Sequence, residues 1–202
     1  MVKKYRNVLE MAGLKPQTLE TEIISVIRAI NLTSKSPTTI LMNVGRFNTS
    51  IVVIEQGIIS FIYSIPLGSV AISRAVMTQF NLAEDQADQY IKVYGVSNQQ
   101  TGEKIANVIQ PILQSLLTEV RKALAYYSEK NKQSSNVSQI ILSGQLSTLS
   151  GIDIFFVKNL GMETVIANPW KMRSIERVPK QILDTETDYA TAVGLALVDY
   201  EK

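Results

Sequence analysis

The chain has 202 residues, of which 46% are hydrophobic and 19% are charged, and its formal net charge is +2. This composition predicts a folded protein with a sizeable core, and it argues against a disordered chain or a basic nucleic-acid-binding surface. Because the sequence contains no Cys and no His, disulfides, thiolate chemistry and every Ser-His or Cys-His catalytic scheme are excluded.

Two helices are predicted ahead of the first strand. Lys3–Ala12 and Leu19–Asn31 both carry apolar residues at helical spacing, and Thr18 is a suitable cap for the second helix. The polar loop at 33–37 follows and is the best candidate for a domain boundary. No apolar segment follows the charged residues after Met1, so no signal peptide is expected.

The most informative stretch contains three apolar runs, Ile40–Met42, Ile51–Ile54 and Ile58–Ile62, separated by two turns. Their β-branched residues predict strands, and the first turn has the Gly, Thr and Ser residues that suit a phosphate-holding hairpin. Residues 49–68 are long enough to raise the question of a membrane span. Glu55 near their centre and the strand signals favour a buried hairpin instead, so the chain is not expected to be transmembrane.

Helices and strands alternate through the rest of the chain. The predicted helices are Ser69–Phe80, Leu82–Tyr94, Thr101–Lys130, Gly151–Leu160 and Asp188–Tyr200. The predicted strands are Val137–Leu142 and Glu163–Ile166, with loops at 96–100 and 131–135 and an irregular stretch at 171–187. Pro111 removes one backbone hydrogen bond inside the longest helix, so a kink or two helices meeting near Gln110 are expected.

Strands joined by helices, with antiparallel strands at one edge, predict an α/β fold. Motif-like segments then occur in a fixed order: Leu9–Pro16, Asn43–Ser50, Phe61–Gly68, Gln86–Gly95, Leu142–Gly151, Asn168–Pro169 and Tyr189–Leu197. Their order and spacing resemble the PilM family, the cytoplasmic actin-like proteins of type IV pilus assembly, which are relatives of FtsA. Asn43–Ser50 resembles that family's Asp-x-Gly-x-x-x-Thr phosphate loop, and Leu142–Gly151 resembles its adenine loop.

The resemblance implies one lobe of an actin-like, ribonuclease H-like fold. It implies a mixed sheet with an antiparallel three-strand unit flanked by helices, together with a helical subdomain. The implied division is 1–34 as connecting helices, 35–70 with 135–202 as the α/β subdomain, and 71–134 as an inserted, mainly helical subdomain. No first phosphate loop precedes residue 36, which leaves a truncated chain and a natural half-length protein as open alternatives.

Seven residues are the cofactor-binding candidates that the resemblance implies. They are Asn43, Gly45, Asn48, Thr49 and Ser50 in the first turn, and Ser143 and Gly144 in the second. No catalytic residue and no metal ligand is predicted. The nearest cofactor is ATP with Mg²⁺, because the family's phosphate-loop Asp acts through a hydrated Mg²⁺ ion.

The chain departs from the family's pattern at four expected contact positions: Asn43 for Asp, Leu67 for Gly, Ile91 for Lys and Gln145 for Gly. The neutral Asn43 is a poorer partner for Mg²⁺ than a carboxylate. Lys92 lies one position beyond the expected Lys and is rotated by about 100° around the helix, so it is expected to face elsewhere.

Several of these residues have an ordinary structural explanation as well. Gly45 and Thr49 suit any hairpin turn, and Gly144 suits a turn between a strand and a helix. Phe47 at the tip of the first turn is expected to pack on a neighbouring element, with an anchor for a protein partner as the alternative. The carboxylates at 84–88 lie at a helix start, which favours them electrostatically without a metal ion.

Two functions follow from these expectations. The first is a non-catalytic, PilM-like cytoplasmic scaffold of type IV pilus or related secretion-type assembly, peripheral at the inner face of the cell membrane, with weak or no nucleotide binding. Its partners would be inner-membrane pilus assembly proteins with a short cytoplasmic tail, although the family's groove for that tail lies in the part that this chain lacks. Edge-strand or helix-face contacts, or self-association, would then substitute.

The alternative is the ATP-binding half of an actin-like ATPase, completed by an N-terminal lobe. Catalysis by this chain alone is not expected, because phosphoryl transfer needs charge on both sides of the phosphates and a metal anchor. A kinase-like or chaperone-like relative of the same superfamily is a third alternative, and no nucleic-acid partner is expected.

Overall fold

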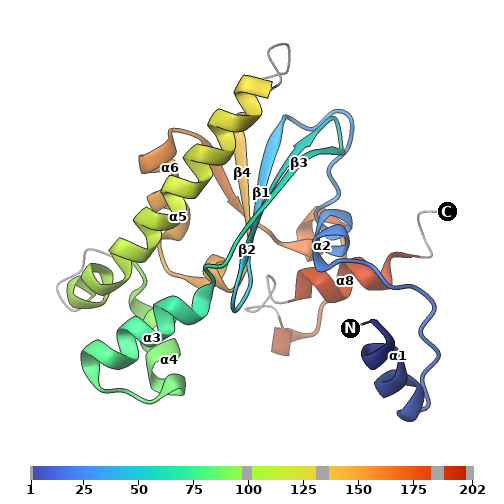
Figure 1. The fold of residues 1–202 in the computed structure, drawn as a ribbon, viewed down its shortest axis with the longest axis horizontal. Helices are drawn as coiled ribbons and strands as arrows, with labels where there is room; N and C mark the ends of the chain where they lie inside the picture. The colour runs from blue at the N-terminus through green and yellow to red at the C-terminus, as the bar shows by residue number, and fades with distance from the viewer. Residues whose placement is uncertain (1, 97–101, 131–136, 183–188, 199–202) are drawn as a thin grey trace.

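A five-stranded mixed sheet forms the centre of the fold (Figure 1). The computed structural model describes residues 2–96, 102–130, 137–182 and 189–198. The strands are β1 (Thr39–Val44), β2 (Thr49–Glu55), β3 (Ile58–Ile65), β4 (Gln139–Gly144) and β5 (Glu163–Ile166). Their order is β3-β2-β1-β4-β5, with β1 antiparallel to β2 and parallel to β4, β3 antiparallel to β2, and β5 parallel to β4. The predicted mixed sheet with an antiparallel three-strand unit is confirmed.

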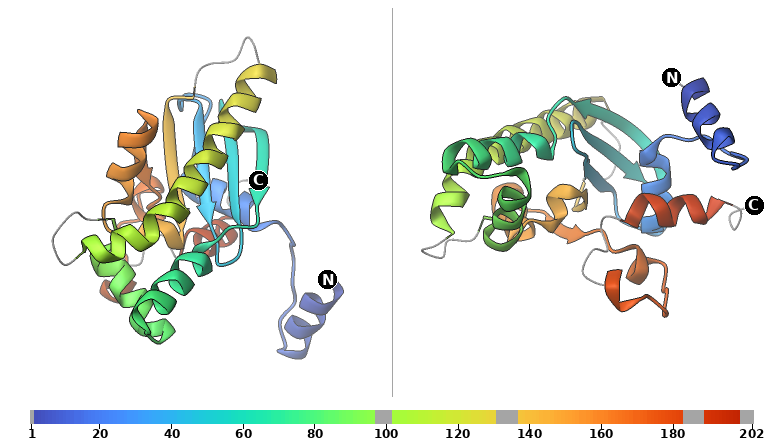
Figure 2. Two further views of the ribbon diagram at one scale, coloured as in Figure 1. Left: turned by 60° about the vertical axis from the view of Figure 1, so that its left-hand side comes forward. Right: turned by 90° about the horizontal axis from the view of Figure 1, so that it is seen from below.

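Helices cover both faces of this sheet (Figures 1 and 2). They are α1 (Val2–Met11), α2 (Glu22–Ile30), α3 (Ser69–Phe80), α4 (Glu84–Tyr94), α5 (Glu103–Lys130), α6 (Ile152–Leu160), α7 (Pro169–Met172) and α8 (Ala190–Ala196). Two short 3-10 helices, η1 (Gln145–Thr148) and η2 (Lys180–Ile182), complete the described elements.

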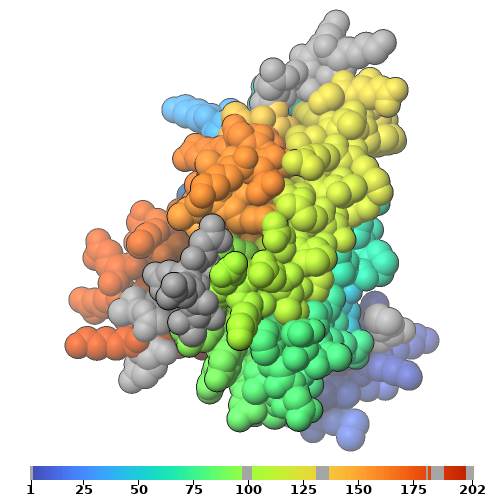
Figure 3. Space-filling model, turned by 90° about the vertical axis from the view of Figure 1, so that its left-hand side faces the viewer, coloured from blue at the N-terminus to red at the C-terminus, as the bar shows by residue number. Residues whose placement is uncertain are grey.

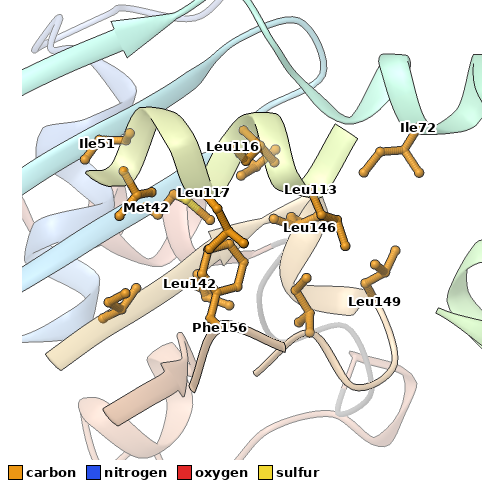
Figure 4. Close-up of a cluster of buried hydrophobic side chains, with 14 of the residues drawn as sticks. Met42, Ile51, Ile72, Leu113, Leu116, Leu117, Leu142, Leu146, Leu149 and Phe156 are labelled. Atoms are coloured by element: carbon orange, nitrogen blue, oxygen red, sulfur yellow. The ribbon is translucent and has the colours of Figure 1, made fainter. Parts of the chain in front are cut away.

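The larger core lies between the sheet and the long helix α5 (Figure 4). Because side chains alternate across a strand, Met42 and Ile51 point to this face, where they join Leu113 and Leu117 from α5. Phe156 from α6 is fully buried in the same cluster. Packing along the whole length of β1 and β4 therefore holds the ends of these strands in place. This in turn fixes the turns that follow them.

The smaller core lies on the opposite face, between the sheet and the helices α2 and α8. The alternate residues of the strands, such as Leu41 and Ile141, point here and are buried. Helix α8 crosses α2 so closely that a Cβ atom on Gly194 would lie 1.8 Å from the carbonyl oxygen of Ser25. The glycine is therefore required for this helix crossing.

Arg28 of α2 links the segment before this helix to α8. Arg28 donates to both carboxylate oxygens of Glu20 at 2.7 and 2.8 Å, and to the carbonyl oxygen of Gly194 at 2.9 Å. Arg173 donates to the carbonyl oxygen of Arg28, which adds the segment after α7 to the same cluster. The Arg28 hydrogen bond lowers the pKa of the Glu20 carboxyl from its ordinary value.

Most predicted elements are present, with shifted ends. The second helix begins at Glu22 with Thr21 at its N-cap, so the cap predicted at Thr18 was wrong. The strands β1 and β4 extend to Val44 and Gly144, and α8 is shorter than the predicted final helix. Helix α7 and η2 lie in or next to the stretch that was predicted to be irregular. The predicted loops at 97–100 and 131–135 lie outside the described residues.

Helix α5 is one continuous helix through Pro111, so the alternative of two helices was wrong. Pro111 and Asn107, whose carbonyl loses its helical partner, are both exposed, so water can bind that carbonyl. Helix α1 buries none of its residues and stands apart from the sheet in both views of Figure 2. Among the described helices, none combines the length and the apolar character needed to cross a membrane.

Substituting Glu20→Gln should lower the free energy of unfolding by about 1–2 kcal/mol at pH 7, because a charged, mostly buried hydrogen-bonded pair is lost. The folded-state pKa of Glu20 lies below the ordinary value of 4.5, so this stabilisation is complete above that value and disappears as the pH falls through the folded-state pKa. Urea denaturation of both proteins from pH 3 to 8 measures the difference.

Glu10→Gln is the matched control, because its pair with Arg6 lies on α1 with both side chains about half exposed. It should change the free energy of unfolding by less than about 0.5 kcal/mol. Equal effects of the two substitutions at pH 7 would contradict the role given to Glu20.

Candidate functional site

The candidate residues gather where β1 and β4 end and β2 begins. Strand register places Asn43 beside Ser143 on one side and beside Ser50 on the other, and Ser50 pairs with Ser64 in β3. The four side chains form a polar row across four strands at one end of the sheet. The polar row lies on the face that carries α2, because Asn43 contacts Glu22 at the start of that helix.

Asn43 is engaged by the protein itself. Its side-chain amide donates to Oε1 of Glu22 at 3.2 Å, and the residue is only 6% exposed. An aspartate at this position would bring a second carboxylate to hydrogen-bond distance of Glu22, and two such groups need a proton or a cation between them. The Asn43–Glu22 contact is therefore stable without a metal ion.

The first turn, Gly45–Asn48, is closed by its own backbone and by α3. The Gly45 amide donates to the carbonyl of Asn48 at 2.9 Å. The amides of Ser69 and Val70 at the start of α3 donate to the carbonyls of Gly45 and Arg46, both at 3.0 Å. These first amides of α3, which are often available to bind an anion at a helix start, are therefore engaged in holding the turn.

Thr49 and Ser50 begin β2, and their hydroxyl groups also have protein partners. Thr49 is fully buried and donates from Oγ1 to the carbonyl of Leu67 at 2.6 Å. The hydroxyl groups of Ser50 and Ser64 lie 3.4 Å apart. Asn48 is exposed at the end of the turn. Of these three residues, Asn48 alone presents its side chain openly to solvent.

The second turn depends on Gly144. Its φ angle is 78°, and a Cβ atom there would lie 2.3 Å from the carbonyl oxygen of Val44. Glycine is thus needed for both the backbone conformation and the close approach of β4 to β1. The preceding Ser143 is 1% exposed, and its hydroxyl group has no hydrogen-bond partner among the described residues.

A cavity of about 200 Å³ lies between the two turns and the helix pair α3–α4. Protein contacts link the elements around this cavity. Arg46 pairs with Glu84 at 2.6 Å, Ser73 donates to Asp88 at 2.6 Å, and Ser69 donates to Gln145. Drug-sized ligands usually occupy pockets of about 300–1,000 Å³, so this cavity suits only part of a nucleotide.

The structure changes two expectations about single residues. Lys92 lines the cavity together with Ile91, although its position one residue further along the helix predicted that it would face elsewhere. Phe47 is 65% exposed, with the Arg46 guanidinium 5.7 Å from its ring centre, so the predicted packing on a neighbouring element was wrong. The carboxylates of Glu84 and Asp88 have the partners described above.

Sequence reasoning missed the contact partners at this site. Glu22 belongs to the predicted helix Leu19–Asn31, but nothing in the sequence indicates that it would bind Asn43. The Arg46–Glu84 pair joins residues 38 positions apart. No group of three or more acidic side chains among the described residues is arranged to hold a metal ion.

Comparison with known proteins places this geometry in a family. The family model of the type IV pilus assembly protein PilM matches residues 1–200. The chain belongs to the PilM family. No curated protein matches the sequence significantly.

Solved structures show the same fold for this PilM-family chain. A "PilM-PilN type IV pilus biogenesis complex" matches with a TM-score of 0.80 and 23% identity over 97% of this chain and 56% of that one. The ethanolamine utilization protein EutJ of Carboxydothermus hydrogenoformans matches with a TM-score of 0.67 and 20% identity, over 94% and 58% of the two chains. MreB5 of Spiroplasma citri bound to AMPPNP matches with a TM-score of 0.71 and 14% identity, over 99% and 64%. The PilM-family chain thus spans little more than half the length of these proteins, and it has the fold of one actin-like lobe.

Substituting Asn43→Asp should destabilise the protein by about 1–2 kcal/mol in EDTA, because a hydrogen bond becomes a contact between two carboxylates. Millimolar Mg²⁺ should recover part of the loss, since two carboxylates together attract a divalent cation. Thermal unfolding with and without Mg²⁺ measures both effects.

The matched control is Asn48→Asp, which makes the same chemical change at the exposed end of the same hairpin. It should leave the melting temperature unchanged in EDTA and in Mg²⁺. An Asn43→Asp protein as stable as the unsubstituted one in EDTA would show that Glu22 does not face this side chain in solution.

Proposed function

We propose that this PilM-family chain is a protein scaffold of type IV pilus or related secretion-type assembly, with weak or no nucleotide binding of its own. In this role it acts in the cytoplasm, peripherally at the inner face of the cell membrane. The proposal combines the family membership with the state of the polar groups at the ends of β1 and β4.

One observation carries the scaffold proposal. At the site where the resemblance implies phosphate binding, the first amides of α3, the Asn43 amide and the Thr49 hydroxyl are all engaged in protein contacts. A phosphate would have to replace these hydrogen bonds, and each replacement reduces the net gain from binding. The position that would assist a Mg²⁺ ion carries a neutral amide whose hydrogen bond to Glu22 needs no cation.

The partner is a membrane-anchored pilus assembly protein. The similar PilM structure is described as a complex with PilN, which supports a partner of that kind. The resemblance implies a short cytoplasmic tail as the contacting segment. The family's groove for this tail lies outside the part of the family's length that this chain covers.

The alternative function is the ATP-binding half of an actin-like ATPase. Spiroplasma citri MreB5 is similar to this chain and has been solved with AMPPNP and with ADP, which favours the alternative. The cavity beside Gln145 and the unpartnered hydroxyl of Ser143 also favour it. In that case an opposing lobe supplies the remaining contacts.

Isothermal titration calorimetry with Mg-ATP separates the two functions for this chain. The scaffold function predicts a Kd weaker than about 100 μM, which corresponds to about 5.5 kcal/mol. The variant Lys92→Glu, which reverses a charge at the cavity, should give the same result as the unsubstituted chain. Tighter binding that this variant weakens would establish the ATP-binding alternative.

Restoration of pili tests the role in assembly. Deletion of the gene should remove surface pili, and both the natural protein and its Lys92→Glu variant should restore them. Electron microscopy of the cell surface measures the outcome. Pili that persist after the deletion would overturn the assembly role, whereas restoration by the natural protein alone would favour the ATPase alternative.

A further inference from the structure

The two edges of the sheet differ in length and in charge. β5 forms one edge with four residues and begins with the charged Glu163. β3 forms the other edge with eight residues, Ile58–Ile65, and contains neither a charged residue nor a proline. Natural sheets usually protect an edge of this length with charges, proline or bulges.

The features that usually protect an edge are confined to one end of β3. The register shift between Val53 and Ile54 leaves Ser60 of β3 unpaired between Ile59 and Phe61, so β3 itself has a bulge near its start. Beyond the bulge no described strand pairs with the outer side of β3, and Ile62 is 49% exposed there. The outer backbone N–H and C=O groups of this strand therefore suit pairing with a further strand.

A groove runs along the same strand, between β3 and α5. One part has a volume of about 380 Å³ and is lined by Phe61, Tyr63, Lys122, Ala123 and Tyr126. The neighbouring part has about 390 Å³ and shares Tyr63 as a lining residue, so the two parts adjoin at this side chain. Figure 3 shows α5 (yellow-green) crossing this face between α6 (orange) and the cyan-to-teal strand unit.

Aromatic rings form the apolar wall of this groove. The ring centres of Phe61 and Tyr126 lie 5.2 Å apart, and those of Phe61 and Tyr63 lie 6.4 Å apart. Tyr126 is 49% exposed although it is a large aromatic residue. Since Phe61, Tyr63 and Ile65 lie two positions apart on one strand, the groove fits side chains that repeat every second residue of an added strand.

The charges beside the groove favour an acidic occupant. Lys122 is 64% exposed and pairs with Glu119, which also accepts a hydrogen bond from Tyr63 at 2.9 Å. Lys130 lies over the Tyr126 ring at 5.7 Å and adds a second positive charge. Glu119 and Lys122 balance each other, so Lys130 supplies the net positive charge beside the groove.

We propose that β3 and α5 form a docking site for an extended protein segment that adds a strand to the sheet. The segment has apolar side chains at alternate positions that enter the groove, and acidic residues that meet Lys122 and Lys130. A second copy of this chain is a poorer occupant, because two-fold pairing of β3 would bring the lysine-bearing rims together. That the segment belongs to a pilus assembly partner rests on the proposed function, whereas the docking site itself does not.

A fluorescein-labelled peptide, Asp-Val-Phe-Val-Phe-Val-Asp-Glu, is a suitable probe for fluorescence anisotropy. Binding is expected with a Kd on the order of 10–100 μM, and Tyr126→Ala should weaken it at least tenfold by removing an anchor from the groove. Tyr90→Ala is the matched control, because Tyr90 on α4 is 45% exposed and lies beside another tyrosine. It should leave the affinity unchanged, and circular dichroism confirms that both variants are folded.

Two N-methylated peptides test the addition of a strand directly. Methyl groups on the two Phe amides or on the three Val amides block opposite edges of the peptide strand, and only one edge faces β3. One of the two peptides should therefore lose binding and the other should keep it. Equal binding of both, no binding at 1 mM, or equal binding to Tyr126→Ala and Tyr90→Ala would overturn the proposal.

Sedimentation of the chain alone distinguishes the second-copy occupant. A dimer that Tyr126→Ala dissolves would overturn the peptide proposal in favour of self-pairing. If the unsubstituted chain restores pili but does not bind the probe, the docking site is overturned and the proposed function stands. If the unsubstituted chain binds the probe but does not restore pili, the docking site stands and the proposed function is overturned.

Discussion

The pairing of β1 with β2 on one side and with β4 on the other is the constraint on which the site depends. It aligns Asn43 with Ser143 and with Ser50, and it brings Gly144 so close to Val44 that no side chain fits between them. Both faces of β1 are buried, so a shift in its pairing register would turn its side chains to the opposite face and expose apolar residues to water. The positions of the two turns follow from packing in the cores, without any contribution from a ligand.

This independence separates the architecture of the site from its chemistry. In a working nucleotide site, buried donors face the place where the phosphates bind, and they remain unpaired until the ligand arrives. Here the first amides of α3, the Asn43 side chain and the Thr49 hydroxyl group already have protein acceptors, and Arg46 and Glu84 join the first turn to α4. Ser143, in contrast, has a buried hydroxyl group without a partner among the described residues. The same turn geometry is thus maintained by internal hydrogen bonds, which lowers the advantage of adding an anion.

Sequence patterns predicted the parts of the fold that depend on local order. Three β-branched runs predicted β1 to β3, and the helical spacing of apolar residues predicted α3 within its observed bounds. The partners at the site could not be predicted, because Asn43 and Glu22 are 21 positions apart and meet only after α2 packs on the sheet. Rotation about the helix did not predict that Lys92 would line the cavity beside Ile91, because it places only the Cβ atom of a long side chain. Phe47 was expected to be buried because aromatic side chains usually are. This average tendency does not determine the exposure of one residue at the tip of a turn.

Internal hydrogen bonds hold the end of β1 in shape. A protein partner can therefore bind elsewhere, where backbone N–H and C=O groups of the sheet still lack a paired strand. These groups lie at the edges, and only β3 has both the length and the uncharged surface that strand addition needs. The groove beside β3 is built from α5 and the antiparallel unit, which pack against each other in the larger core. A segment bound there would therefore rest on a surface that the central packing already holds rigid, so little ordering free energy would oppose its binding. The internal contacts that make the nucleotide site self-sufficient also make this lobe a firm support for a protein partner.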